Sequence, residues 1–328
     1  MNAAAKDGSG SEAKAGQGGP AFLAPLGLCL TALLWGGMLP ISHALVHQVY
    51  EPVFLATLRY IAPTPVLLLL CVAVERRWPF SRDLPFLHLL WLGMAMALFS
   101  LMFAYGLRLS DPVRAAIVMS SAPLLATLLA KMMYRTPLER GFWPALVAAI
   151  LGAALVALDA IKPGANAASA GPIPYLGEIM LLFGNLSWTW YSLKAQEWLV
   201  RRRISQLQIS MLTTLAGCVV MLALLSGVEL LSPGHLPQSW PDGSTVAMIL
   251  WMGVGAAGIA VVLWNYGISR VGVPVASVYA NLAPVFSVGI ATLLFGASLS
   301  LQQLLGGGLI LAGIIYMQAL RLGWSLRR

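Results

Sequence analysis

Charged residues are scarce in this sequence. Asp, Glu, Lys and Arg make up only 10% of its 328 residues, whereas 59% are hydrophobic and the mean hydropathy is +0.81. Water-soluble domains carry about 25% charged and about 45–50% apolar residues. With so few charges, a chain of this length cannot cover the surface of a folded domain with polar groups. The composition therefore excludes a water-soluble globular protein and indicates a membrane protein.

Cysteine is scarce as well, and the common catalytic motifs are absent. Cys29, Cys71 and Cys218 each lie in an apolar run without a CxxC spacing or a neighbouring histidine, which argues against a disulfide framework or a zinc site. No HExxH, GxSxG or P-loop GxxxxGKS/T motif occurs in the sequence. We expect no metal, no cofactor and no catalytic residues, so a membrane-embedded enzyme is the weaker alternative.

Long apolar runs are abundant. A bilayer core about 30 Å thick requires about 20 apolar residues in each spanning helix. We therefore predict an all-α membrane protein with ten transmembrane helices. Residues 1–20 are predicted to form a disordered cytoplasmic tail and residues 322–328 a basic cytoplasmic tail. The ten runs are 22–46, 53–74, 86–107, 113–133, 143–159, 173–194, 207–227, 246–267, 274–295 and 301–320.

The basic residues orient these helices, because Lys and Arg are enriched in cytoplasmic loops. With the N-terminus in the cytoplasm, 16 of the 20 Lys and Arg residues fall on the cytoplasmic side, three on the opposite side, and Arg59 within a run. A miscounted helix would invert every later loop and remove this bias, so both termini are expected in the cytoplasm. The net charge of +8 is spread over short loops and does not indicate a nucleic-acid partner.

The two halves of the sequence match when one is shifted against the other. At a shift of 161 residues, the pairs are Pro123 with Pro284, residues 105–107 (YGL) with 266–268 (YGI), and Gly152 with Gly313. We therefore predict two related domains, 21–160 and 173–321, joined by a linker at 161–172. Each domain holds five helices, an odd number, so the second enters the membrane from the opposite side. Such inverted repeats are typical of secondary transporters.

These features resemble the EamA branch of the drug/metabolite transporter superfamily over residues 22–320. The resemblance rests on LLWGG at 33–37, Arg59-Tyr60, the Ala-Pro pairs in the fourth and ninth runs, and the Gly-rich fifth and tenth runs. It implies a ten-helix fold with a central cavity mainly between the first, third, fourth, sixth, eighth and ninth helices, and often export of metabolites or drugs. The family often has a Glu about a dozen residues beyond each proline, where this chain has Thr136 and Ala297.

Polar side chains at membrane depth are costly, so each requires an explanation. Arg59 lies about 10 Å in from the outer end of the second run, where it could bind a carboxylate or, alternatively, extend toward the interface. Aromatic and amide side chains near mid-span suit a small amino-acid-like, amphipathic or aromatic molecule, although packing alone would also explain them. The predicted cavity residues are Trp35, Arg59, Tyr105, Asn185, Trp188, Trp264, Asn265, Tyr279 and Asn281.

Two prolines and two ionisable residues are further candidates. Pro123 and Pro284 each remove a backbone hydrogen bond, which predicts matched kinks that act as hinges or line the cavity. His43 and Glu178 are candidate proton sites, with an interfacial position as the alternative. The small residues of the fifth and tenth runs suit close helix packing within the chain or in a dimer.

These patterns predict a secondary transporter that moves a small organic metabolite or drug by alternating access. Export is expected from the family resemblance. The alternatives are a membrane-embedded enzyme and a non-transporting membrane scaffold. The expected partners are the substrate and the lipid bilayer, with the chain as a monomer or homodimer in a bacterial inner membrane.

Overall fold

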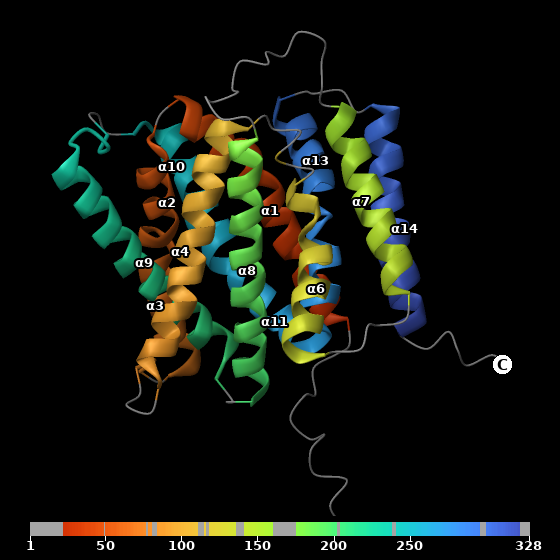
Figure 1. Cartoon of the computed structure of the whole chain (residues 1–328), viewed down its shortest axis with the longest axis horizontal. Coiled ribbons are helices and arrows are strands. Elements are labelled where there is room, and N and C mark those ends of the chain that lie inside the picture. Colours follow the sequence, from red (N-terminus) through yellow and green to blue (C-terminus); the bar gives the residue numbers. More distant parts are fainter. Residues whose placement is uncertain are drawn as a thin grey trace, which may run out of the picture.

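The computed structural model describes residues 22–48, 50–76, 78–80, 84–110, 115, 118–135, 141–159, 175–201, 204–237, 241–295 and 300–321. Every regular element in these ranges is a helix, and the helices stand side by side in an up-and-down bundle (Figure 1). The elements are α1 (Leu23–Gln48), α2 (Pro52–Ile61), α3 (Pro63–Glu75), α4 (Phe86–Leu109), α6 (Ala122–Tyr134), α7 (Phe142–Asp159), α8 (Leu176–Arg201), α9 (Gln206–Leu231), α10 (Gly243–Leu250), the π-helix η2 (Trp251–Ile259), α11 (Ala260–Val271), α12 (Val273–Ala280), α13 (Ala283–Phe295) and α14 (Leu301–Arg321).

Some of these helices continue one another. The π-helix η2 joins α10 to α11 without a gap, α2 and α3 meet at Ala62, and only Asn281 and Leu282 separate α12 from α13. Taken together, the helices of the described ranges make ten consecutive segments in the order of the ten apolar runs. Five are long and apolar enough to cross a membrane: Leu23–Ser42, Pro52–Glu75, Phe86–Leu109, Gln206–Leu231 and Gly243–Val271.

The bundle presents apolar side chains on its outside. Leu69 is 71% exposed, Phe183 59%, Trp91 55% and Leu304 57%. A water-soluble surface rarely exposes contiguous apolar area of this kind, whereas hydrocarbon tails cover it readily. Together with the long apolar helices, this surface makes the chain an integral membrane protein.

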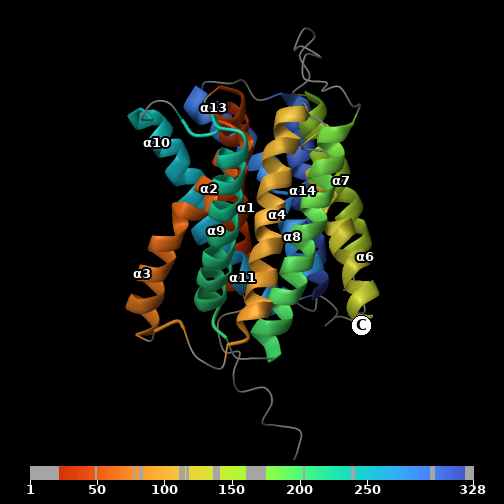
Figure 2. The ribbon, with the colours of Figure 1, turned by 60° about the vertical axis from the view of Figure 1, so that its left-hand side comes forward.

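Helix packing has the symmetry of a duplicated chain. In the first half, α4 packs against α8, which is the first helix of the second half. The elements of the second half that correspond to α4 are η2 and α11, and these pack against α1, the first helix of the first half. Corresponding elements also pair with each other: α7 with α14, and α2 and α3 with α9. Both views show α4 beside α8 and α7 beside α14 (Figures 1 and 2). Exchanging the two halves therefore maps the observed contacts onto one another.

Glycine permits the closest of these contacts. A Cβ atom on Gly152 of α7 would lie 2.4 Å from the carbonyl oxygen of Gly306, and one on Gly313 of α14 would lie 2.9 Å from the Cβ atom of Ala148. Neither distance is accessible to a side chain without movement of the helices. The small residues of α7 and α14 thus serve packing within the chain.

The two repeat prolines begin helices and do not bend continuous ones. A turn at Ser121 precedes α6, and a turn at Asn281 and Leu282 precedes α13, so that Pro123 and Pro284 each lie in the first turn of a new helix. In that position the missing proline N–H costs α6 and α13 no hydrogen bond of their own, although it leaves a carbonyl of the preceding segment without its helical partner. The helical hydrogen bonding is therefore interrupted at matched positions in the two halves, and a role of the prolines as hinges stays a prediction.

Candidate functional site

A cavity lies where the two halves of the chain meet. Its volume is about 120 Å³, and a single water molecule needs about 10–15 Å³ on the same measure. The lining comes from α1, α2, α4, α6, α8, η2, α11, α12 and α13 and from the breaks before α6 and α13. The resemblance had implied a cavity mainly between six helices; the structure adds α2, which contributes Arg59 and Tyr60.

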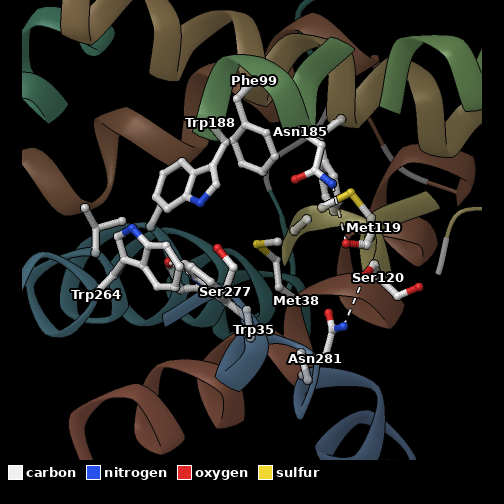
Figure 3. Close-up of a pocket in the computed structure, with 18 of the residues that line it drawn as sticks. Trp35, Met38, Phe99, Met119, Ser120, Asn185, Trp188, Trp264, Ser277 and Asn281 are labelled. Atoms are coloured by element: carbon white, nitrogen blue, oxygen red, sulfur yellow. Dashed lines mark hydrogen bonds between the residues drawn. The ribbon is translucent and has the colours of Figure 1, made fainter. Parts of the chain in front are cut away.

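Three tryptophans form one wall of the cavity (Figure 3). The ring centroids of Trp35 and Trp188 are 5.5 Å apart, those of Trp35 and Trp264 5.2 Å, and those of Trp188 and Trp264 5.9 Å. Trp35 Nε1 donates to the carbonyl oxygen of Ala256 at 3.0 Å, and Trp264 Nε1 donates to Ser192 Oγ at 3.0 Å. These bonds fix two indoles, and the ring planes are inclined to one another by 80°, 43° and 42°, so the wall is a rigid, aromatic and largely apolar surface.

Arg59 brings a positive charge to this cavity. It is only 5% exposed, and its guanidinium carbon lies 5.5 Å from the ring centroid of Phe99 and 5.1 Å from that of Phe103. Its Nε and Nη1 atoms have no hydrogen-bond partner among the residues that the structure describes. Other charged groups, such as Arg108 with Glu51 at 2.8 Å, pair near the ends of the helices. The guanidinium is therefore buried against aromatic faces, and two of its donor atoms have no acceptor among the described residues.

Two amides complete the opposite side of the cavity. Asn185 Nδ2 donates to the carbonyl oxygen of Met119 at 3.4 Å, and Asn281 Nδ2 donates to that of Ser120 at 3.0 Å. Met119 lies four residues before Pro123, which has no N–H for that carbonyl. The amides thus satisfy backbone acceptors that the helix break releases. Asn281 and Ser120 are 161 residues apart, the shift that relates the two halves of the sequence.

The structure brings most of the predicted cavity residues together. Three others lie elsewhere: Tyr105 and Tyr279 are not part of the lining, and Asn265 is fully buried behind it. Asn265 Nδ2 donates to Tyr191 Oη at 3.1 Å and to Ser210 Oγ at 2.8 Å, which ties α11 to α8 and α9. The predicted residues that line the cavity are Trp35, Arg59, Asn185, Trp188, Trp264 and Asn281, with Pro284 beside them. A role of these residues in transport stays a prediction.

Several lining residues were not singled out from the sequence. Phe99 and Phe103 lie four residues apart on α4 and so share the face that meets Arg59. Their spacing next to an arginine at membrane depth was the available signal. Met38, Met96 and Met119 add flexible, polarisable surface.

The proton-site candidates do not lie in the described lining. Glu178, in the first turn of α8, accepts a hydrogen bond from Ser110 Oγ at 2.9 Å and is not part of the cavity wall. The side chain of His43 lies outside the described residues. Within the described lining, Arg59 is the ionised side chain, and no Asp, Glu or His accompanies it. Within the described ranges, no group of three His, Cys, Asp or Glu residues could hold a metal ion.

Comparison with known proteins identifies the family. The chain matches the EamA-like transporter family twice, at residues 22–158 and 175–318. It is 22% identical over 281 residues to the "Uncharacterized transporter YetK" of Bacillus subtilis (strain 168), covering 85% of this chain and 82% of the relative. It is 24% identical over 310 residues to the "Uncharacterized transporter YrdR" of the same organism, covering 90% and 91%.

A solved structure supports the fold. A protein of known crystal structure, 21% identical in sequence, superposes with a TM-score of 0.71 over 90% of this chain and 98% of its own. At this identity the likeness concerns the fold alone. The two family matches cover most of the sequence and leave only its ends and the segment between the halves unmatched. The chain therefore belongs to the EamA-like transporter family, and it is a membrane transporter built from two EamA domains.

Proposed function

We propose that this chain is a secondary transporter that carries a small organic molecule with a flat apolar part out of the cell by alternating access. The observation that carries this proposal is the position of the cavity. It lies between two halves whose packing contacts are related by exchange, and both halves supply its lining. A substrate held there can face either side of the membrane when the two halves exchange conformations.

The direction of the helices supports an inverted repeat of five plus five spans. In Figure 1, α1 rises from the lower end of the bundle, whereas α8, the first helix of the second half, descends from the upper end. The shorter apolar helices Ala122–Tyr134, Phe142–Leu155, Val273–Ser287 and Leu304–Met317 supply further spans in this arrangement. The basic loops then lie in the cytoplasm of a bacterium, with the chain in its inner (cell) membrane.

The proposal is tested by profiling the metabolites in the spent medium of cells that overproduce the chain. The control is the double variant Trp188→Ala, Asn281→Ala, brought to the same membrane abundance. A metabolite class that accumulates outside only with the intact protein is expected. Depletion of a class from the medium would make the protein an importer and contradict export, and identical media would contradict transport of a cellular metabolite.

A further inference from the structure

We propose that the cavity selects a small organic monoanion. Its acidic group binds Arg59, and its flat neutral body lies against Trp35, Trp188 and Trp264. The inference rests on the proposed function, because it names the substrate class of the same cavity. It narrows that class, since molecules carrying an ammonium group, whether cations or zwitterionic amino acids, fit this lining poorly.

The first observation behind this proposal is that Arg59 lacks a counter-charge among the described residues. Arg59 is 95% shielded from solvent and has no hydrogen bond to Nε or Nη1 within the described part of the chain. The rings of Phe99 and Phe103 compensate the charge only in part. A buried cation without an anion is unfavourable. Binding of an anionic group is therefore the event that this environment favours most.

The second step is the geometry of the donors. A guanidinium presents its N–H groups in a planar fork that matches the two oxygens of a carboxylate or sulfonate. Arg59 lines the same cavity as the three indoles, so a ligand in which a short linker joins an acid to a ring can engage both. Trp188 also borders the cavity. Its indole N–H has no acceptor within the described ranges and adds a neutral donor to the site.

The third step is the absence of an anionic partner for an ammonium group. The described lining contains neither Asp nor Glu. The groups available to an ammonium are the amide oxygens of Asn185 and Asn281 and the aromatic faces, and Arg59 opposes it with a like charge. An amino-acid zwitterion would satisfy Arg59 but bury its ammonium against neutral groups, which is costly.

The test is a binding series on one ring scaffold with the purified full chain in lipid nanodiscs. Phenylacetate is the anion, phenylacetamide its neutral isostere, 2-phenylethylamine the cation and phenylalanine the zwitterion. Affinity is measured by calorimetry and by tryptophan fluorescence, which these ligands do not obscure. We expect phenylacetate to bind at least tenfold more tightly than each of the other three.

Two variants test whether Arg59 causes the preference for the anionic probe. Arg59→Met keeps an unbranched apolar stem and removes the charged guanidinium, so phenylacetate and phenylacetamide should bind equally. Because this variant also removes a buried unpaired charge, its melting temperature should match or exceed that of the parent. Arg108→Met is the matched control, since Arg108 is exposed and pairs with Glu51 away from the cavity. It should leave the tenfold preference intact.

The outcomes separate this inference from the proposed function. Equal or tighter binding of 2-phenylethylamine or phenylalanine, loss of the preference in Arg108→Met, or no binding of any probe would overturn anion selection. If the medium assay finds an exported neutral or cationic class, transport stands and anion selection fails. If phenylacetate binds as expected but the media are identical, anion binding stands and export of a cellular metabolite fails.

Discussion

Arg59, Asn281 and Asn265 are buried polar residues at membrane depth, and they differ in the hydrogen-bond partners of their side chains. Asn281 donates to a backbone carbonyl that a helix break has released. Asn265 donates to two hydroxyl groups on neighbouring helices. Arg59 has aromatic faces around it but no acceptor on Nε or Nη1 within the described ranges. A buried polar group without a partner is destabilising. Asn265 Oδ1 also lacks a partner in the described ranges, but Asn265 lies outside the cavity lining, so the unfilled requirement at Arg59 is the one that a ligand in the cavity can meet.

The position of Asn265 predicts a structural effect without a direct effect on the cavity. Asn265→Ala leaves Tyr191 Oη and Ser210 Oγ without their shared donor, so the free energy of unfolding should fall by about 0.5–2 kcal/mol. Unfolding in mixed micelles measures this change. Phenylacetate affinity should stay within about twofold of the parent, because Asn265 does not line the cavity. Unchanged stability with lost binding would make Asn265 a ligand contact instead.

The difference between Asn265 and Asn185 shows what the sequence could predict at this scale. Depth in the membrane was readable from the position of each residue in its apolar run, and it selected both amides correctly as buried. Which face of the helix each occupies was not readable, because these helices are apolar all round and no periodicity marks the cavity side. For that reason the sequence could not separate Tyr105 and Tyr279, which lie outside the described lining, from Phe99 and Phe103, which are part of it.

At the scale of elements, the π-helix η2 closes the cavity against α1. Trp35 Nε1 donates to the carbonyl oxygen of Ala256, and Trp251 Nε1 donates back to that of Leu34 at 3.1 Å. On another side of η2, a Cβ atom on Gly253 would lie 2.6 Å from the Cβ atom of Ala62. The wide turns of a π-helix often occur at functional sites. The repeat prolines could be predicted as interruptions from the sequence, whereas η2 has no proline and could not.

The contact between α7 and α14 predicts a sharp contrast between two glycines. Gly152→Leu places a side chain where the carbonyl oxygen of Gly306 lies, 2.4 Å from the Cβ position. Overpacking of this kind should lower stability by about 1–3 kcal/mol or more. Gly308→Leu on α14 is the matched control, because nothing lies within 4 Å of its Cβ position. Thermal unfolding of both variants measures the contrast, and equal melting temperatures would contradict the observed packing.

At the scale of the whole molecule, the exchange symmetry of the helix contacts and the charge of Arg59 together determine which driving force could act on transport. In the proposed alternating-access mechanism, the two halves close on either side of the membrane around one cavity, to which both contribute. A single Arg59 in that cavity, with no Asp, Glu or His in its described lining, offers an anion site without a proton acceptor. Transport of a monoanion then moves one net negative charge, and an inside-negative membrane potential favours its exit.

This reasoning predicts export driven by the membrane potential. Proteoliposomes are loaded with phenylmethanesulfonate, which stays ionised and does not cross lipid as a neutral acid, and a potassium gradient with valinomycin sets the potential. An inside-negative potential of 100 mV contributes about 2.3 kcal/mol per charge, so at equilibrium the outside concentration should exceed the inside one about fiftyfold. A pH gradient alone should have no such effect, and Arg59→Met should abolish the efflux. Efflux that follows the pH gradient and ignores the potential would instead require proton coupling, through a group such as Glu178 that lies outside the cavity wall.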